Sequence, residues 1–284
     1  MSLRFEIITI FPDFFTGVFD HGIVRRAQAE GLVGVNIHDL RAFTHDRHRT
    51  VDDRPFGGGE GMVMKPEPLA EALESLGARA KEFLRSTPEA RSAPGDRAGA
   101  QVVILLSAQG RRFSQAVARD LAAHERIVLI CGRYEGVDER INQLYCDMEL
   151  SIGDYVLCGG ELAAAVVVDA VMRLVPGVLG NEASGEFESF GVADSEIATD
   201  PDGVPRSQHG SGGLLDYPHY TRPAEFGGLS APDVLLNGDH SQIRRWRREQ
   251  QLRKTLANRP DLLEKAELSD EDRKILRSFA ENPA

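Results

Sequence analysis

The sequence predicts an α/β protein with a mostly parallel sheet and a small helical C-terminal domain. Two observations lead to this fold class: strand and helix patterns alternate over the first 180 residues, and most of the strand patterns are near-continuous apolar runs. Parallel strands are covered by helices on both faces, so their sequences are apolar throughout. A chain of 284 residues can bury one large core and still form a smaller second unit.

The alternation begins with apolar, β-branched runs at residues 4–10 and 33–38. Between them, hydrophobic residues recur at helical spacing over residues 12–29, which predicts a β-α-β beginning. Another helix is expected over residues 66–76. Residues 77–100 are small, charged and proline-containing, a composition typical of a loop.

The second half of the predicted sheet comes from residues 102–107, 126–131 and 148–152, which are further apolar strand patterns. A helix at residues 114–123 separates the first two. Residues 161–175 are apolar almost all round, which predicts a helix buried on most faces.

The chain divides into three predicted segments. Residues 1–180 form the α/β domain, residues 181–213 a flexible acidic linker without periodic pattern, and residues 214–284 a helical domain. In the last segment Ser269 and Asp272 have the spacing of a capping box and predict the start of a final helix.

Charge is distributed unevenly along the chain. The net charge is -11, and residues 182–202 hold seven acids without a Lys or Arg. Residues 244–254 carry six basic residues opposed only by Glu249, on a helix that Ser241 is expected to cap. This basic run indicates contact with a nucleic-acid backbone, and the alternative is a core-anchored helix with a solvated basic face.

Targeting and cysteine patterns suggest a soluble, cytoplasmic protein. No apolar run reaches 18 residues, and the first residues resemble a strand and not a signal peptide. The cysteines Cys131, Cys146 and Cys158 are odd in number and lack CxxC spacing, so neither a disulfide framework nor a zinc site is expected.

Glycine-rich segments are the first candidates for a ligand site. They are GGGEG (57–61), GRYEG (132–136) and GDYVLCGG (153–160), and the last two directly follow strand patterns, as LSAQG (106–110) does. Neither dinucleotide-fold nor P-loop spacing is present. Each segment alone could be only a tight turn, but three neighbouring strand ends with such loops predict a pocket at the carboxyl edge of the sheet.

A second candidate is the basic segment at residues 41–62. Its arginines have the guanidinium forks that match phosphate geometry, which predicts contact with phosphates. The alternative is a solvated, self-paired run of charges. Metal binding by His45 and His48 is less favoured, because neighbouring arginines repel a cation.

Long strings spread over nearly the whole chain resemble the bacterial tRNA (guanine-N1)-methyltransferases of the SPOUT superfamily. They are THDRHRTVDDRPFGGGEGM, CGRYEGVDERI, SIGDYVLCGGELA, RLVPGVLGNEAS, GLLDYPHYTRP and VLLNGDHSQIRRWR. The resemblance implies a trefoil knot in the α/β domain, a rare exception to unknotted topology. It also implies a homodimer that uses S-adenosylmethionine to methylate the guanosine 3′-adjacent to the anticodon of tRNA, with neither DNA nor a membrane as partner.

By position, the resemblance also assigns residues that bind S-adenosylmethionine. They are Leu105, Leu106, Ser107, Gly132, Tyr134, Glu135, Gly136, Ile152, Gly153, Tyr155, Leu157, Gly159 and Gly160. No metal site is implied, and whether the reaction requires Mg²⁺ stays open.

The same resemblance assigns Arg173 as the catalytic arginine, although pairing with Asp169 is a structural alternative. Guanine N1 must lose a proton as it is methylated, so a general base is needed, and a guanidinium can stabilise the negative charge that develops on O6. The family has an Asp as the base where this chain has Glu188. The longer side chain displaces the carboxylate by about an ångström, so Asp194 is a second candidate.

Two other functions remain compatible with the sequence. One is a related methyltransferase acting on a ribose 2′-hydroxyl, and the other is a non-catalytic RNA-binding protein of the same fold. The substitution at Glu188 is the feature that favours the second.

Overall fold

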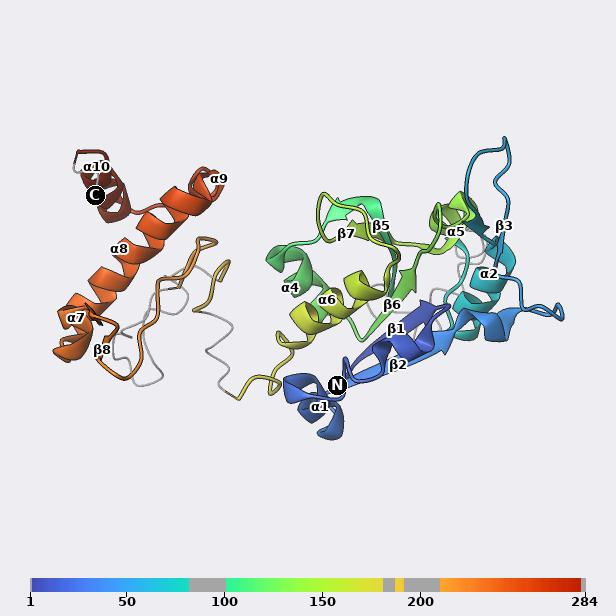
Figure 1. The fold of residues 1–284 in the computed structure, drawn as a ribbon, viewed down its shortest axis with the longest axis horizontal. Coiled ribbons are helices and arrows are strands. Elements are labelled where there is room, and N and C mark those ends of the chain that lie inside the picture. Colours follow the sequence, from blue (N-terminus) through green and yellow to red (C-terminus); the bar gives the residue numbers. More distant parts are fainter. Residues whose placement is uncertain (1, 82–100, 181–186, 192–209, 282–284) are drawn as a thin grey trace. The chain divides into compact units, whose positions relative to one another are not determined.

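The chain folds into two compact units. The computed structural model describes residues 2–81, 101–180, 187–191 and 210–281. One unit comprises Met1–Gly180 and the other Asn181–Ala284. Figure 1 shows the sheet in the first unit and the long helix α8 in the second.

The first unit is built on a five-stranded sheet in the order β2-β1-β6-β5-β7. All four pairs of neighbouring strands are parallel, which confirms the predicted mostly parallel sheet. Its strands are β1 (Leu3–Thr9), β2 (Val33–Asp39), β5 (Gln101–Arg112), β6 (Arg126–Cys131) and β7 (Met148–Ser151).

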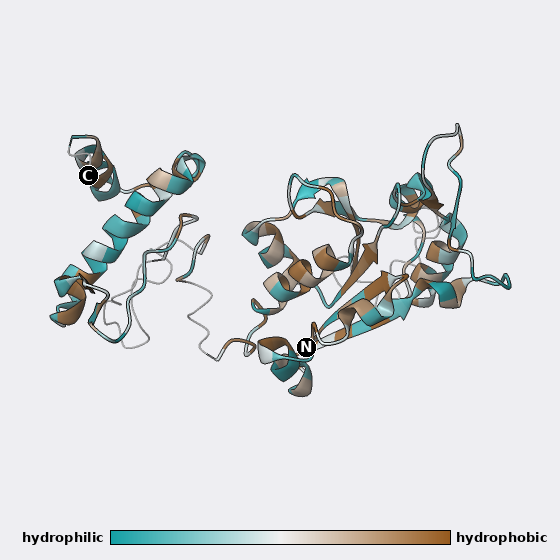
Figure 2. Ribbon diagram, viewed as in Figure 1, coloured by the Kyte–Doolittle hydropathy of each residue, from teal (hydrophilic) through white to brown (hydrophobic). Residues whose placement is uncertain are grey.

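Helices cover both faces of this sheet. Helices α1 (Gly22–Ala29), α4 (Gln115–Ala122) and α6 (Glu161–Met172) pack against one hydrophobic cluster. The other face carries α2 (Pro66–Ser75), α5 (Glu139–Tyr145) and the 3-10 turn η2 (Leu40–Phe43). Figure 2 shows β6 and α6 mostly brown, as expected for elements that are buried on most sides.

The single helix expected over residues 12–29 is wrong. A 3-10 turn, η1 (Pro12–Phe15), precedes α1, and the chain between them is not helical. Gly17 and Gly22 adopt positive φ angles of 84° and 60°, which interrupt a right-handed helix. Phe15 and Phe19 still stack in the core, at 5.5 Å between ring centroids.

Helix α6 is buried on most faces, as predicted, but ends earlier than expected. It stops at Met172, with Arg173 as its C-cap, because the following amides bond back over only three residues and tighten the chain ahead of Pro176. Leu162 and Val166 are exposed, so the helix keeps one apolar stripe uncovered.

Strand β5 is longer than the predicted strand at residues 102–107. It continues through LSAQG to Arg112 and pairs with β7 across a register shift between Leu106 and Arg111. A Cβ atom on Gly110 would lie 2.5 Å from the backbone of Glu149 and Leu150, so only glycine allows this approach. LSAQG is therefore a bulged part of the strand and not a loop that follows it.

A short hairpin that the sequence did not indicate encloses the GGGEG segment. Its strands are β3 (Asp52–Asp53) and β4 (Val63–Met64), paired antiparallel. Phe56 lies in the connecting loop with a fully exposed ring.

The second unit is helical, as predicted, and adds a small hairpin of β8 (Glu225–Phe226) and β9 (Leu229–Ser230). Its helices are α7 (Asp233–Leu236), α8 (His240–Asn258), α9 (Pro260–Leu263) and α10 (Asp270–Glu281). None of the helices in the described part of the chain has the length and hydropathy needed to cross a bilayer.

Of the two helix caps predicted in the second unit, one is wrong and one is confirmed. Asp239, and not Ser241, caps α8, because its carboxylate accepts bonds from the amides of Ser241 and Gln242. The capping box of α10 is confirmed: the amide of Ser269 donates to Asp272 at 2.9 Å, and the amide of Asp272 donates to the hydroxyl of Ser269 at 3.1 Å.

Asp272 makes this unit sensitive to acid. Burial alone would raise the pKa of its carboxyl, but hydrogen bonds from Arg248 and Ser269 bring the pKa below the ordinary value of 3.8. The resulting stabilisation is complete above pH 3.8 and is lost as the pH falls through the lower, folded pKa. We therefore expect Asp272→Asn to have a lower unfolding free energy than the wild type at pH 6, and this difference to shrink as the pH falls below 3.8 through the lower, folded pKa.

Urea unfolding of both proteins between pH 6 and pH 2.5 measures this effect. A deficit that persists unchanged at the acid end would contradict the role of the charged carboxylate.

Candidate active site

An open cavity lies at the carboxyl ends of β6 and β7 and at the bulge of β5, the strand between them. It holds about 750 Å³ of empty space, counting its open mouth. Three segments contribute most of its wall: residues 106–109, residues 132–136 and residues 150–160, with Ala163 of α6 below. Cavities at this edge of parallel sheets are the usual ligand sites of α/β proteins.

The cavity wall is held together by backbone contacts between two loops. Arg133 and Gly159 form an antiparallel bridge, and the amide of Gly160 donates to the carbonyl of Gly132 at 2.9 Å. Tyr134 adopts a positive φ of 60° in the tight turn that follows. The GRYEG and GDYVLCGG loops therefore form one continuous cup.

The β3–β4 hairpin is also attached to this cup. The amide of Glu135 donates to the carbonyl of Met62 at 3.0 Å, and the amide of Met64 donates to that of Gly136 at 2.9 Å. A Cβ atom on Gly61 would lie 2.5 Å from the carboxylate of Glu135. The GGGEG segment does not follow a strand of the main sheet. It nevertheless packs against the GRYEG loop and so contributes to the structure of the cup.

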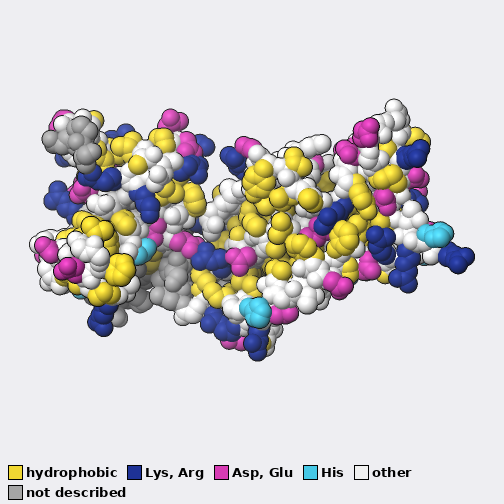
Figure 3. Space-filling view, in the orientation of Figure 1, with side chains coloured by type: hydrophobic (Ala, Val, Ile, Leu, Met, Phe, Trp, Pro, Cys, Tyr) yellow, Lys and Arg dark blue, Asp and Glu magenta, His cyan; other side chains and the backbone are white. Residues whose placement is uncertain are grey.

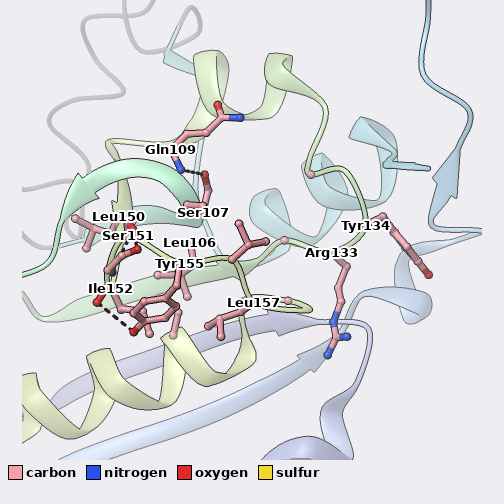
Figure 4. A pocket seen from close by; sticks show the side chains of 18 of the residues that line it. Leu106, Ser107, Gln109, Arg133, Tyr134, Leu150, Ser151, Ile152, Tyr155 and Leu157 are labelled. Carbon is pink, nitrogen blue, oxygen red and sulfur yellow. Dashed lines mark hydrogen bonds between the residues drawn. The ribbon is translucent and has the colours of Figure 1, made fainter. Parts of the chain in front are cut away.

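Side chains divide into two groups around the cup. Figure 4 shows Leu150, Ser151, Ile152 and Tyr155 gathered on one side, while Arg133 and Tyr134 lie on the opposite side and point away from them. The hydroxyl of Tyr155 donates to the carbonyl of Ile152 at 3.3 Å. The cavity is therefore lined by apolar side chains and by polar groups of the backbone. Such a lining suits a flat heterocycle with polar edges.

Beneath the cup lies a buried ion pair between Arg133 and Glu161. The carboxylate of Glu161 is 1% exposed and lies 2.9 Å from the guanidinium of Arg133. Thr9 donates its hydroxyl to the same carboxylate at 2.8 Å, and the guanidinium lies 4.5 Å from the ring centre of Phe11. The pair joins the GRYEG loop to the start of α6.

We expect Arg133→Ala to lower the unfolding free energy by about 3 kcal/mol, because the carboxylate of Glu161 would stay buried without its cation. Chemical denaturation measures the loss. In Arg133→Ala combined with Glu161→Gln the loss should be smaller, since no unpaired charge remains buried. Equal losses in the single and the double variant would contradict this account.

The structure brings together twelve of the thirteen residues expected to bind S-adenosylmethionine, all lining this cavity. The exception is Leu105, whose side chain is buried in the hydrophobic cluster on the α2 side of the sheet. Along a strand, successive side chains point to opposite faces, so Leu105 and Leu106 cannot both face the cavity. Lining residues absent from the expected set are Ala108, Gln109, Arg133, Leu150, Ser151, Val156 and Ala163.

The expected catalytic residues belong to different units. Arg173 caps the C-terminus of α6 in the first unit, whereas Glu188 lies in a turn of the second. Asp194 lies outside the described residues.

Residues 41–62 present cations to solvent. Arg47, Arg49 and Arg54 are exposed, and none of their guanidinium groups forms an ion pair with a described carboxylate. His45 instead pairs with Glu71 at 2.8 Å. Among the described residues, no three His, Cys, Asp or Glu side chains cluster as metal ligands would.

The basic run at residues 244–254 is only partly exposed, so neither sequence interpretation applies to all six of its cations. Arg248 is largely buried and forms an ion pair with the buried Asp272 at 2.7 Å. Arg247 lies over the ring of Tyr217, and Arg253 over that of Phe279. Such pairings depend on residues distant in sequence and could not be read from the run itself. Arg245 and Lys254 remain exposed.

A parallel α/β sheet with a glycine-rich cup at its carboxyl edge is the architecture of α/β enzymes that bind a small ligand at this edge. Comparison with known proteins makes the class specific. The model of the tRNA (guanine-1)-methyltransferase family TrmD matches residues 3–265. The chain belongs to this family.

Similar proteins with curated names agree with this membership. The tRNA (guanine-N(1)-)-methyltransferase of Koribacter versatilis is 57% identical over 274 residues, which cover 96% of this chain and 97% of that protein. The protein of the same name from Geobacter metallireducens is 46% identical over 98% of both chains. That from Dehalococcoides mccartyi is 48% identical over 96% of both.

Proposed function

We propose that this protein transfers a methyl group from S-adenosylmethionine to N1 of the guanosine 3′-adjacent to the anticodon in tRNA. The observation that carries the proposal is the cup formed by the GRYEG and GDYVLCGG loops, in a chain of the tRNA (guanine-1)-methyltransferase family. The methyl donor supplies an electrophilic methyl group on a sulfonium. The protein has to bind it, place the guanine and remove one proton.

The residues of the cup suit S-adenosylmethionine. Leu106, Ile152 and Leu157 offer apolar contacts for an adenine ring, and backbone amides and carbonyls of residues 132–136 and 153–160 can bond its edges and the ribose. Gly160 has no side chain, so its backbone packs directly against Cys131 and Gly132. This close packing allows the backbone of both loops to approach a ligand in the cavity.

Glu188 is proposed to accept the N1 proton, since a carboxylate is a base of suitable strength once it is placed beside the guanine. Arg173 is proposed to stabilise the negative charge that develops on O6. Both are half-buried, so neither is fully solvated. Asp194 stays the second candidate for the base.

Exposed cations are proposed to contact the tRNA backbone. Those of the first unit are Arg47, Arg49 and Arg54, and those of the second unit include Arg245 and Lys254. Guanidinium groups match phosphate geometry, and phosphate contacts supply most of the sequence-independent affinity.

We also propose a cytoplasmic homodimer. Its support is an apolar surface on the first unit, formed by the exposed side chains of Tyr155, Val156, Leu157, Leu162 and Val166. Figure 3 shows hydrophobic side chains gathered over the middle of this unit. Free thiols at the three cysteines suit a reducing compartment. The trefoil knot stays a prediction supported by the family.

Nucleoside analysis tests the proposed reaction. The purified protein is incubated with labelled S-adenosylmethionine and a tRNA transcript with G 3′ of the anticodon, and the RNA is digested to nucleosides. We expect label in 1-methylguanosine, and none when that G is replaced by A. Label in a 2′-O-methylated nucleoside, or no transfer at all, would overturn the proposal.

A further inference from the structure

The proposed base lies in a short turn that is bound to the second unit on both sides. The turn comprises residues 187–191, and within it the amide of Gly191 donates to the carbonyl of Glu188 at 3.0 Å. Phe190 adopts a positive φ of 63°. Phe187 and Gly191, at the two ends, are buried. Glu188 is therefore carried by a defined turn whose ends are fixed.

Four hydrogen bonds join this turn to residues 211–216. The amide of Phe190 donates to the carbonyl of Leu214 at 2.8 Å, and the amide of Gly213 donates to that of Gly191 at 3.0 Å. Two hydroxyls add side-chain bonds: Ser211 accepts from the amide of Gly191 at 2.6 Å, and Ser189 accepts from that of Asp216 at 2.9 Å. The two segments therefore form one hydrogen-bonded structure.

Helix α8 in turn holds residues 211–216. The hydroxyl of Thr255 accepts from the amide of Leu215 at 3.0 Å and donates to the carbonyl of Gln251 at 2.7 Å, within the helix. Thr255, Gln251 and Ser211 are each 0% exposed. Because water cannot replace bonds at buried groups, this anchor is costly to break.

The ion pair of α8 with α10 supports the same anchor. The guanidinium of Arg248 donates to the two carboxylate oxygens of Asp272 at 2.7 and 2.9 Å. Its remaining nitrogen donates to the side chain of Gln251 at 3.1 Å and lies 3.5 Å from the carbonyl of Ser211. A bidentate pair of this kind fixes the rotamer of the arginine.

We propose that Thr255, Ser211 and Arg248 are positioning residues for Glu188, so that the second unit, and not the cup, places the base. This inference rests on the proposed function of Glu188 as the base. None of the three needs to touch the guanine or the methyl donor, since each acts through the turn that carries Glu188.

Thr255→Val tests this placement, because valine has nearly the same shape but cannot accept from the amide of Leu215. We expect kcat for methyl transfer to tRNA to fall by about ten- to a hundredfold, as displacements near an ångström do. KM for tRNA and for S-adenosylmethionine should stay within about twofold. Thr255→Ser keeps the hydroxyl and should restore most of kcat. Ser211→Ala removes the bond to Gly191 and should lower kcat in the same way.

Ser278→Ala is a control that removes a hydroxyl elsewhere in the second unit. Its hydroxyl donates at 2.7 Å to the carbonyl of Ile275 within α10 and has no bond to the turn. We expect its kcat to equal that of the wild type. Thermal unfolding of each variant, followed by circular dichroism, ensures that assays run well below the unfolding temperature. A Thr255→Val protein that is folded and has wild-type kcat would overturn the inference.

Glu188→Gln separates this inference from the proposed function. If Glu188→Gln keeps wild-type kcat, the assignment of the base is wrong. If Glu188→Gln is inactive while Thr255→Val is fully active, only the positioning role is wrong. Adding Thr255→Val to Glu188→Gln should cause little further loss, because residues that act as a unit are not additive. A further loss as large as in the single variant would contradict the inference.

Discussion

Replacing Glu188 by Gln is expected to lower kcat for methyl transfer by about 10²- to 10⁴-fold, the range that a general base contributes. Glutamine keeps the shape and the hydrogen-bonding reach of the side chain but cannot accept a proton at neutral pH. The cup that is proposed to bind S-adenosylmethionine is built from residues of the other unit, so we expect the Kd for S-adenosylmethionine to stay unchanged. Single-turnover kinetics with excess enzyme measure the chemical step directly.

Asp194→Asn and Glu188→Asp complete this comparison. Asp194→Asn should keep activity within about threefold, and Glu188→Asp should be active because its carboxylate can still accept the proton. An inactive Asp194→Asn protein beside an active Glu188→Gln protein would assign the base to Asp194 instead.

The second large effect is expected for Gly160→Ala. A Cβ atom at this position would lie 2.7 Å from Cα of Cys131 and 3.1 Å from the amide nitrogen of Gly132. Both contacts are backbone at the end of β6, so the clash has to move the GRYEG and GDYVLCGG loops apart. We expect the affinity for S-adenosylmethionine to fall by about a hundredfold or more, as measured by calorimetry.

Gly34→Ala is a suitable control for this change. Gly34 lies on β2, outside the cup, and an added Cβ would make only an ordinary contact at 3.5 Å with Arg4. It should bind the methyl donor like the wild type. Donor binding by Gly160→Ala at wild-type affinity would show that the cup is not the donor site.

The sheet and the cup were predictable because their signals are local and repeated. Apolar runs such as residues 126–131 indicate a strand buried on both faces, and this strand was placed correctly. Glycine loops after neighbouring strands indicated a common edge, and β6, β5 and β7 are indeed neighbours. Features that depend only on the local sequence, such as the buried strands and the glycine loops after them, could therefore be predicted.

What could not be predicted depends on contacts between distant residues. The buried pairing of Arg248 with Asp272 joins residues 24 positions apart, so the basic run alone suggested a free surface. The bulge at Gly110 follows from how closely β7 approaches β5. The turn around Glu188 is fixed by bonds to residues 211–216, although its own composition resembles a linker.

The most direct test of the central claim is a crystal structure of the protein with S-adenosylmethionine bound. We expect the donor within the cup, in contact with the loops of residues 132–136 and 153–160 and with Leu106 beside the bulge of β5. A donor bound at any other place on the molecule would contradict it.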